Sequence, residues 1–171
     1  IDSSLIELSD SWNSGDVTGT GTGNSDCKIG GVVGDVGSAL NDESFIRNCY
    51  NTGKVTNNSG SASKYVATGG LFGGLGSGYG ENIGRLWNSG DVVSTASNTG
   101  GIAGVLKSGN TLKDCYNLGS VTGKRYAGGI AGYNDSASGS KVASSFSYGE
   151  LVSGSSDAGA IAGNNYSNNV G

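Results

Sequence analysis

The same order of apolar residues occurs five times along this chain. Each copy starts with an aliphatic residue, reaches an aromatic residue four positions later, continues as Asn-x-Gly-x-Val and ends in a stretch like Gly-Gly-Ile-Ala-Gly, with the fifth copy degenerate. The copy from Leu112 to Gly132 shows both halves most clearly. Self-similarity at a period of about 30 residues indicates a repeat protein, in which each unit buries its apolar side against its neighbours.

Equivalent positions form columns when the copies are stacked. The aliphatic column is Leu8, Ile46, Ile83, Leu112 and Val142, and the column of the short Gly-x-Val strand is Val17, Val55, Val92, Val121 and Leu151. The aromatic column is Trp12, Tyr50, Trp87, Tyr116 and Phe146, and the next is Asn13, Asn51, Asn88, Asn117 and Ser147. The two aliphatic columns predict a core. The Asn column predicts a ladder of side-chain amides bonded along the stack axis.

A charged column favours parallel stacking of the copies. The residue before each Val faces outward by the two-residue alternation of a strand. Asp16, Lys54 and Asp91 occupy this position in the first three copies. Parallel stacking puts these opposite charges on adjacent rungs, which is favourable for cross-strand neighbours.

The glycine-rich half is expected to be one strand. Its central column, Val32, Leu71, Ile102, Ile130 and Ile161, should point inward. Alternation then turns the flanking glycines inward as well, and it turns Val33, Phe72, Ala103, Ala131 and Ala162 outward as a flat, weakly hydrated surface. The space beside inward glycines favours inward aromatic residues. If Cys49 and Cys115 face inward instead, the aromatic residues form an external stripe, and periodicity alone leaves both arrangements open.

These patterns predict an all-β fold, a right-handed parallel β-helix (β-solenoid). It should have about five rungs of roughly 30 residues, with three short strands in each. A β-propeller would need about four strands in each unit of ~40–45 residues. We expect residues 1–171 to form a single segment of a longer protein, with the longer connections at 18–28 and 56–65 forming a bump at one corner.

Composition excludes several classes of function. The chain has 34 glycines, a content that would indicate disorder if the glycines were not periodic. Because they recur within the repeat, an ordered fold is expected. The net charge is −4 and the Lys and Arg residues are scattered singly, which excludes nucleic acid as an expected partner. No apolar run approaches the ~20 residues that span a bilayer, so membrane insertion is not expected.

Catalytic and metal-binding groups are sparse. The chain has no His and no Cys-x-x-Cys, so no zinc site is expected, and no cofactor is expected either. Its 14 acidic residues are dispersed, and Asp42-Glu43 is the adjacent pair. We therefore expect no enzyme and no catalytic residues. Cys49 and Cys115 fall two rungs apart, roughly 9.6 Å at the sheet spacing, which predicts reduced thiols rather than a disulfide.

The two half-motifs resemble a known repeat. The residues that carry the resemblance are Thr68–Gly73 and Tyr126–Gly132, each paired with Cys-Tyr-Asn-x-Gly-x-Val or Trp-Asn-Ser-Gly-Asp-Val. They resemble the GLUG repeat of bacterial IgA-specific metalloendopeptidases and of large secreted or cell-surface bacterial proteins. The resemblance implies a non-catalytic repeat region, because the zinc site of those peptidases belongs to a separate domain with a His-Glu-x-x-His motif. It covers nearly the whole chain.

We therefore expect a structural or adhesive module of an extracellular or bacterial cell-surface protein, acting as a stalk or as a protein-interaction surface. Its expected partners are neighbouring repeats and a host or cell-surface protein or glycan. The alternative is a carbohydrate-binding β-helix, for which the candidate binding residues are Phe72, Tyr65, Tyr79, Tyr133 and Tyr166. Exposed, coplanar aromatic residues in one groove would favour sugar binding, and buried ones would favour the stalk.

Overall fold

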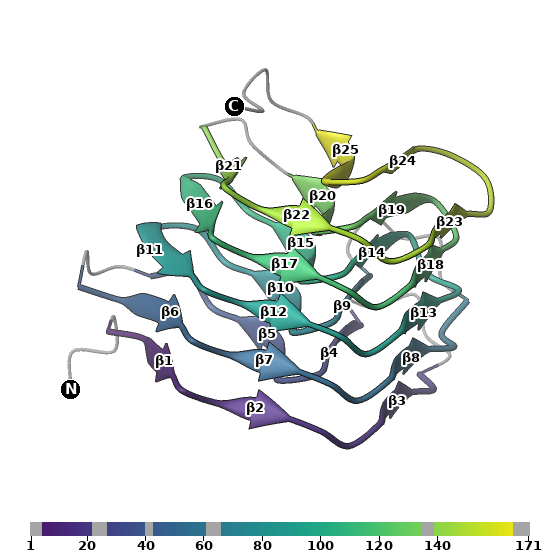
Figure 1. Ribbon diagram of the computed structural model, residues 1–171, viewed down its shortest axis with the longest axis horizontal. Helices are drawn as coiled ribbons and strands as arrows, with labels where there is room; N and C mark the ends of the chain where they lie inside the picture. The colour runs from purple at the N-terminus through teal and green to yellow at the C-terminus, as the bar shows by residue number, and fades with distance from the viewer. Residues whose placement is uncertain (1–4, 22–26, 40–42, 61–65, 135–138, 166–171) are drawn as a thin grey trace.

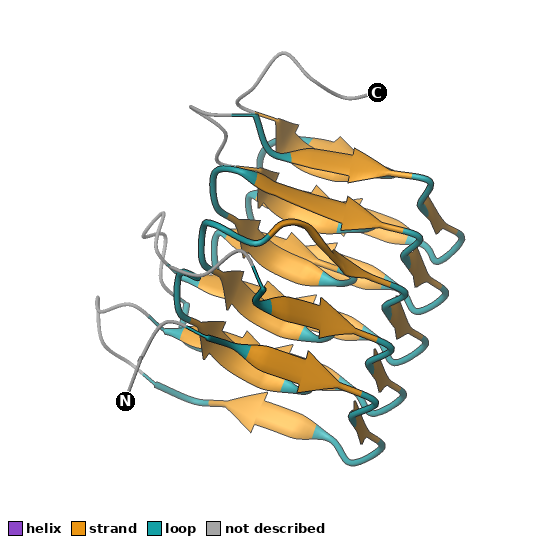
Figure 2. Ribbon diagram, turned by 90° about the vertical axis from the view of Figure 1, so that its left-hand side faces the viewer, coloured by secondary structure: helices purple, strands orange, loops and turns teal. Residues whose placement is uncertain are grey.

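Equivalent residues of the five repeats lie one above another in the computed structural model, which describes residues 5–21, 27–39, 43–60, 66–134 and 139–165. The chain climbs as a right-handed parallel β-helix from the N-terminus to the C-terminus (Figure 1). Every rung of the described chain contributes one strand to each of five parallel five-stranded sheets. Figure 2 shows the strands of successive rungs stacked along the rod. The predicted all-β fold with five rungs is confirmed.

The sheets are named A to E in the order in which a rung visits them. Sheet A contains β1 (Glu7–Ser9), β6 (Phe45–Arg47), β11 (Gly80–Gly84), β16 (Asn110–Lys113) and β21 (Lys141–Ala143). Sheet B contains β2 (Trp12–Asn13), β7 (Tyr50–Asn51), β12 (Trp87–Asn88), β17 (Tyr116–Asn117) and β22 (Phe146–Ser147). Sheet C contains β3 (Val17–Gly19), β8 (Val55–Asn57), β13 (Val92–Ser94), β18 (Val121–Gly123) and β23 (Leu151–Ser153).

The remaining two sheets come from the glycine-rich halves. Sheet D contains β4 (Lys28–Gly30), β9 (Ala67–Gly69), β14 (Asn98–Gly100), β19 (Tyr126–Gly128) and β24 (Ala158–Gly159). Sheet E contains β5 (Val33–Val36), β10 (Phe72–Leu75), β15 (Ala103–Leu106), β20 (Ala131–Asn134) and β25 (Ala162–Asn165). Each described rung therefore has five short strands, and the prediction of three was wrong.

A left-handed residue separates sheet A from sheet B in every rung. These corner residues are Asp10, Asn48, Arg85, Asp114 and Ser144, with φ between 47° and 56°. The turn changes which residues face the core, so that Ile46 and Cys49 are both buried although three positions separate them. Asn and Asp tolerate this conformation better than other L-residues.

A bend at the two residues before each sheet E strand splits the glycine-rich half. Leu71 lies in such a bend and is buried, and Phe72, the first residue of β10, is also buried with 0% exposure. Ala103 and Ala131 are buried at the equivalent position. The predicted flat outer surface, Val33, Phe72, Ala103, Ala131 and Ala162, is therefore wrong: its central members belong to the core, because the bend restarts the alternation.

The core consists of two clusters. The larger lies between sheets A and E and includes Ile46, Cys49, Leu71, Phe72 and Ile83. The smaller lies inside sheet C, where the Val column packs against sheet D; its members are Val55, Val92 and Val121, with Ile29 and Leu151 against them. Both aliphatic columns of the sequence are confirmed as core except for Val17 of the first rung, which is half-buried and belongs to neither cluster.

The glycines bring sheets D and E into backbone contact. A Cβ added at Gly132 would lie 2.5 Å from the Thr99 amide nitrogen and 2.7 Å from the Gly104 carbonyl oxygen. At the bend, a Cβ at Gly70 would lie 2.6 Å from Cγ of Asn88. The space beside the glycines is thus filled by neighbouring backbone and by the Asn column, not by aromatic rings.

Replacing Gly132 by alanine is expected to lower the free energy of unfolding by about 2–3 kcal/mol, since the added methyl group meets backbone that cannot rotate away. Urea unfolding followed by circular dichroism measures the change. Gly37→Ala is the matched control, because a Cβ there meets no atom within 4 Å. Equal stability of the two variants would contradict the close approach of sheets D and E.

Candidate functional site

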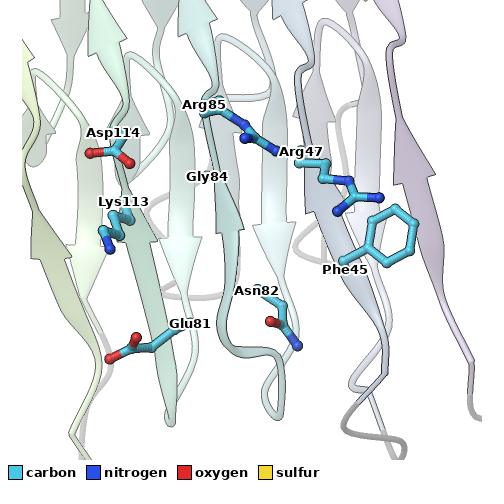
Figure 3. A pocket seen from close by; sticks show the side chains of 8 residues that line it. All are labelled: Phe45, Arg47, Glu81, Asn82, Gly84, Arg85, Lys113 and Asp114. Atoms are coloured by element: carbon cyan, nitrogen blue, oxygen red, sulfur yellow. The ribbon is translucent and has the colours of Figure 1, made fainter.

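A shallow depression lies on the outer face of sheet A (Figure 3). Its volume is about 200 Å³. The residues that line it are Phe45, Arg47, Glu81, Asn82, Gly84, Arg85, Lys113 and Asp114. They come from three consecutive rungs, through β6, β11 and β16 and the corners that follow β11 and β16.

The depression exists because the third rung lacks a side chain where its neighbours have long ones. Gly84 pairs with Arg47 on one side and with Lys113 on the other. The glycine therefore leaves a gap one rung wide between two cationic side chains. Gly84 also tolerates no Cβ without adjustment, since that atom would lie 2.7 Å from the Lys113 carbonyl oxygen.

A β-bulge forms one end of the depression. Gly80 pairs with Asn110 and Ile83 pairs with Leu112, so β11 has one residue more than β16 over this stretch. The extra length accommodates Glu81 and Asn82, both exposed. Bulges redirect side chains and are frequent beside functional sites.

Three cationic side chains line the depression, and none of them has a paired carboxylate among the described residues. The Arg47 guanidinium lies 4.1 Å from the centre of the Phe45 ring, and the Arg85 side chain extends toward Arg47 (Figure 3). Within the described part of the chain, no carboxylate lies within 4 Å of the charged nitrogens of Arg47, Arg85 or Lys113. The depression therefore presents hydrogen-bond donors and positive charge to solvent.

A hydrogen bond from Asn48 and the positive charge of the depression lower the pKa of the nearby Asp10 carboxyl. Its pKa is lowered, first by the hydrogen bond that Asn48 Nδ2 donates to Asp10 Oδ1 at 2.9 Å, and to a smaller extent by the positive charges of Arg47 and Arg85. Asp10 is thus ionised at neutral pH and marks the end of the cationic region toward the first rung.

The aromatic column lies outside the core, as a ladder on sheet B. Successive ring centroids, in the order Trp12, Tyr50, Trp87, Tyr116 and Phe146, are 5.9, 4.3, 5.9 and 5.2 Å apart. Their planes deviate from parallel by only 3–8°. The favoured inward arrangement was therefore wrong, and the alternative, with Cys49 and Cys115 buried, is the one observed.

Stacking leaves the inner rings with only their edges exposed. Tyr50, Trp87 and Tyr116 are half-buried, each covered on both faces by its neighbours. Trp12 and Phe146, at the two ends, are 63% and 56% exposed. Because centroids less than 6 Å apart leave no room for a ring between them, a sugar has no ring face to stack on along the middle of the ladder.

The predicted binding aromatics are not gathered into one groove. Phe72 is in the core, and Tyr79 is 2% exposed with its hydroxyl donating to the Gly37 carbonyl at 2.8 Å, where burial raises the tyrosine pKa to about 12. Burial leaves neither side chain a surface for a ligand. Tyr133 is half-buried beside Tyr126, with ring centroids 5.8 Å apart. Tyr65 and Tyr166 lie outside the described residues.

The cysteines are free thiols, as predicted. Cys49 and Cys115 are buried and donate to the carbonyl oxygens of Arg47 and Lys113 at 3.3 and 3.2 Å. Burial raises the pKa of both thiols, that of Cys115 to about 12. They therefore act as core residues rather than as nucleophiles. Across the described ranges there is no group of three potential metal ligands, and no helix there is long and apolar enough to span a membrane.

The residues of the outward charged column stack in register, and their carboxylates connect neighbouring rungs by hydrogen bonds. Asp16 Oδ1 accepts from the Lys54 backbone N–H at 2.9 Å, and Asp91 Oδ1 accepts from the Ser120 backbone N–H at 3.0 Å and the Ser120 hydroxyl at 2.6 Å. Hydrogen bonds from Ser120 lower the pKa of Asp91. Each carboxylate thus ties its turn to the next rung.

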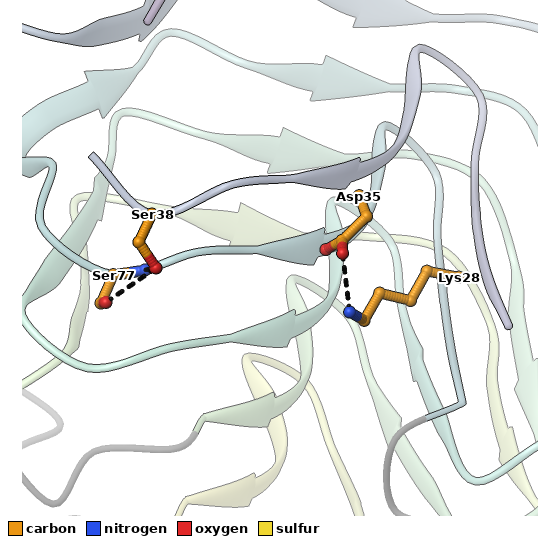
Figure 4. A network of polar contacts seen from close by, with 4 residues as sticks. All are labelled: Lys28, Asp35, Ser38 and Ser77. Atoms are coloured by element: carbon orange, nitrogen blue, oxygen red, sulfur yellow. Dashed lines mark hydrogen bonds and ion pairs between the residues drawn. The ribbon is translucent and has the colours of Figure 1, made fainter. Parts of the chain in front are cut away.

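One polar pair joins sheet D to sheet E, and another joins the loops that follow sheet E in the first two rungs. Lys28 Nζ and Asp35 Oδ2 form an ion pair at 2.7 Å, and the Ser77 hydroxyl donates to Ser38 Oγ at 3.1 Å (Figure 4). Both pairs satisfy groups of the first two rungs internally, so they offer little to a ligand.

Sequence reasoning missed the cationic depression because Arg47, Arg85 and Lys113 are far apart in the chain. The available signal was columnar: Gly84 occupies the position at which the neighbouring copies have Arg and Lys. Comparisons with known proteins add no assignment. No protein-family model, no curated protein and no solved structure matches this chain.

Proposed function

We propose that this chain is a non-catalytic structural and interaction module, a stiff spacer in an extracellular or bacterial cell-surface protein. The observation that carries the proposal is the Asn ladder. Asn13, Asn51 and Asn88 each donate from Nδ2 to Oδ1 of the next Asn at 2.8 Å, and Asn117 donates to Ser147 Oγ at 3.3 Å. A side-chain hydrogen bond from this column thus connects every rung to the next, between two amides at the first three steps and between an amide and a hydroxyl at the last.

Each Asn also holds its own turn. Asn51, Asn88 and Asn117 donate to the carbonyl oxygen two residues later at 2.7, 2.6 and 2.7 Å. The amides are fully buried at these three rungs. Buried amides with satisfied hydrogen bonds specify one arrangement of the chain, because any shift in register leaves them unpaired.

The aromatic ladder adds a second connection along the same axis. Offset-stacked rings contribute about 0.5–1.5 kcal/mol per pair beyond the area that they bury. Together the two ladders make a rod in which side chains on sheet B connect each rung to the next. A protein built in this way serves to hold distance and to display its lateral faces.

The resemblance of the repeat to the GLUG motif supports a place outside the cell, as does a composition dominated by Gly, Ser, Asn and Thr. The experiment is to raise antibodies against the purified module and label cells that produce the protein. Labelling of intact cells, or recovery of the antigen from the medium, is the expected result. Labelling that requires permeabilised cells would refute the extracellular assignment.

A further inference from the structure

We infer that the depression on sheet A binds the anionic group of an acidic polysaccharide, a uronate or a sulfated sugar. This inference deepens the proposed function, because it assigns a ligand class to one lateral face of the interaction module. It rests on three departures from the repeat that coincide in the third rung: a missing side chain at Gly84, the bulge at Glu81 and Asn82, and an arginine at the corner.

The corner arginine is the most informative of the three. Arg85 has φ 56°, in the left-handed region, where the other corners have Asp, Asn, Asp and Ser. Arg lacks the short polar side chain that makes this conformation tolerable for Asn and Asp. Backbone strain of this kind is often found at functional sites. The fold alone would be served better by Asn at position 85, so the arginine points to a role beyond folding.

The side chains around the gap match an anion held from two sides. Arg47 and Lys113 stand two rungs apart across Gly84, and Arg85 projects from the corner of the rung between them. A guanidinium binds carboxylate and sulfate groups through paired N–H donors, whereas an ammonium acts as a compact point charge. The three cations therefore offer donors to an anionic group from three consecutive rungs.

Acceptors beside the cations narrow the ligand class. Glu81 and Asp114 are exposed and line the same depression. Their carboxylates accept hydrogen bonds from hydroxyl groups. A ligand with hydroxyls around one anionic group satisfies both sets, and an acidic sugar is such a ligand.

The size and openness of the site favour a polymer that crosses the face. Pockets that enclose drug-sized ligands usually measure ~300–1,000 Å³, and this depression measures about 200 Å³. It therefore accommodates one charged sugar unit. The rest of the polysaccharide would lie along the outer face of the protein. An acidic polypeptide is less well matched, because protein interfaces depend on buried aromatic and apolar anchors, and the one ring of the depression, Phe45, is covered by Arg47.

The test measures binding of the purified module to immobilised polygalacturonate and heparin at ~50 mM salt, where surface charges are weakly screened. Polygalacturonate supplies carboxylates and heparin supplies mainly sulfates, so the two arms identify the anion. Dextran is the neutral comparison and poly-glutamate is the acidic polypeptide. We expect binding to at least one acidic polysaccharide, weaker binding to poly-glutamate, and none to dextran.

Two variants remove cations from the depression. Arg85→Asn and Lys113→Gln are each expected to weaken binding roughly tenfold, the loss of one charge-assisted hydrogen bond. Lys124→Gln is the matched control: it removes the same charge from an exposed side chain in the turn after β18, at the opposite side of the rod (Figure 1). It should change binding less than about twofold, because a distant surface charge is largely screened.

The same Arg85→Asn variant reports on strain. Its Tm is expected to rise by ~2–4 °C, since Asn suits the left-handed corner. An unchanged or lower Tm would show that Arg85 serves the fold, which overturns the assignment. So would equal losses for Lys124→Gln and Arg85→Asn, equal binding of poly-glutamate, or no binding of either polysaccharide. None of these results changes the surface labelling of cells, which tests the proposed function separately.

Discussion

Replacing Asn88 by alanine is expected to lower the free energy of unfolding by about 3–5 kcal/mol. Asn88 is fully buried; it accepts from Asn51 Nδ2 at 2.8 Å and donates to the Gly90 carbonyl at 2.6 Å and to Asn117 Oδ1 at 2.8 Å. Alanine offers no replacement for any of these bonds. Each buried polar partner left unsatisfied costs ~1–3 kcal/mol, so the loss should exceed that of an ordinary surface change.

Urea unfolding followed by circular dichroism measures this loss, with the slope of the transition expected to stay unchanged. Asn13→Ala is the matched control at the end of the ladder, where the side chain is half-buried and forms part of the same network. It should cost only about 1 kcal/mol, because water can replace the lost partner. Equal losses at both positions would mean that burial along the ladder contributes nothing.

Replacing Phe72 by alanine is expected to cost about 3–5 kcal/mol, as is typical for a phenylalanine removed from a packed core. Phe72 is 0% exposed and packs in the cluster between sheets A and E. The position pairs with Val33 and Ala103 in the neighbouring rungs, and the latter is already too small to fill the space left behind.

The control is Phe146→Ala, which removes the same side chain from the end of the aromatic ladder, where 56% of it is exposed. That change should cost about 1 kcal/mol, mostly the stacking with Tyr116. Thermal unfolding of both variants gives the comparison. A Phe72→Ala protein as stable as the parent would return Phe72 to the surface and restore it as a candidate binding residue.

The strand register and the core were predictable because five copies of the repeat place the same residue types at equivalent positions. One Leu or Asn is ambiguous, but a column of Asn13, Asn51, Asn88 and Asn117 leaves parallel stacking as the arrangement that brings all four amides together. The paired strands confirm this register throughout sheet B.

The facing of individual residues was not predictable from alternation, because two turns in each rung restart it. The left-handed corners consist of residues such as Asn48 and Asp114, whose sequence context resembles that of any polar residue. The bend before Phe72 contains no proline, and its Gly69-Gly70 pair was predicted to be part of one continuous strand although such a pair also marks turns. The errors over Phe72, Ala131 and the aromatic column all have this cause.

The cationic depression was hidden for a different reason. Arg47, Gly84 and Lys113 meet through strand pairing across intervals of 37 and 29 residues, and the bulge in β11 shifts the local register by one. Along the sequence, the three cations of the depression are isolated residues of an acidic protein. Only their alignment by the stack turns them into neighbours.

The Asn ladder also gives the rod a polarity. All four amides donate toward the C-terminal end, and Asn51, Asn88 and Asn117 also accept from the Asn of the preceding rung. The side-chain dipoles along the ladder therefore point the same way. Aligned hydrogen bonds polarise and strengthen one another. A further rung at either end can continue this series only in the same orientation, because a reversed rung would set acceptor against acceptor or donor against donor. Growth of such a rod, by repeats or by partners, is therefore directional.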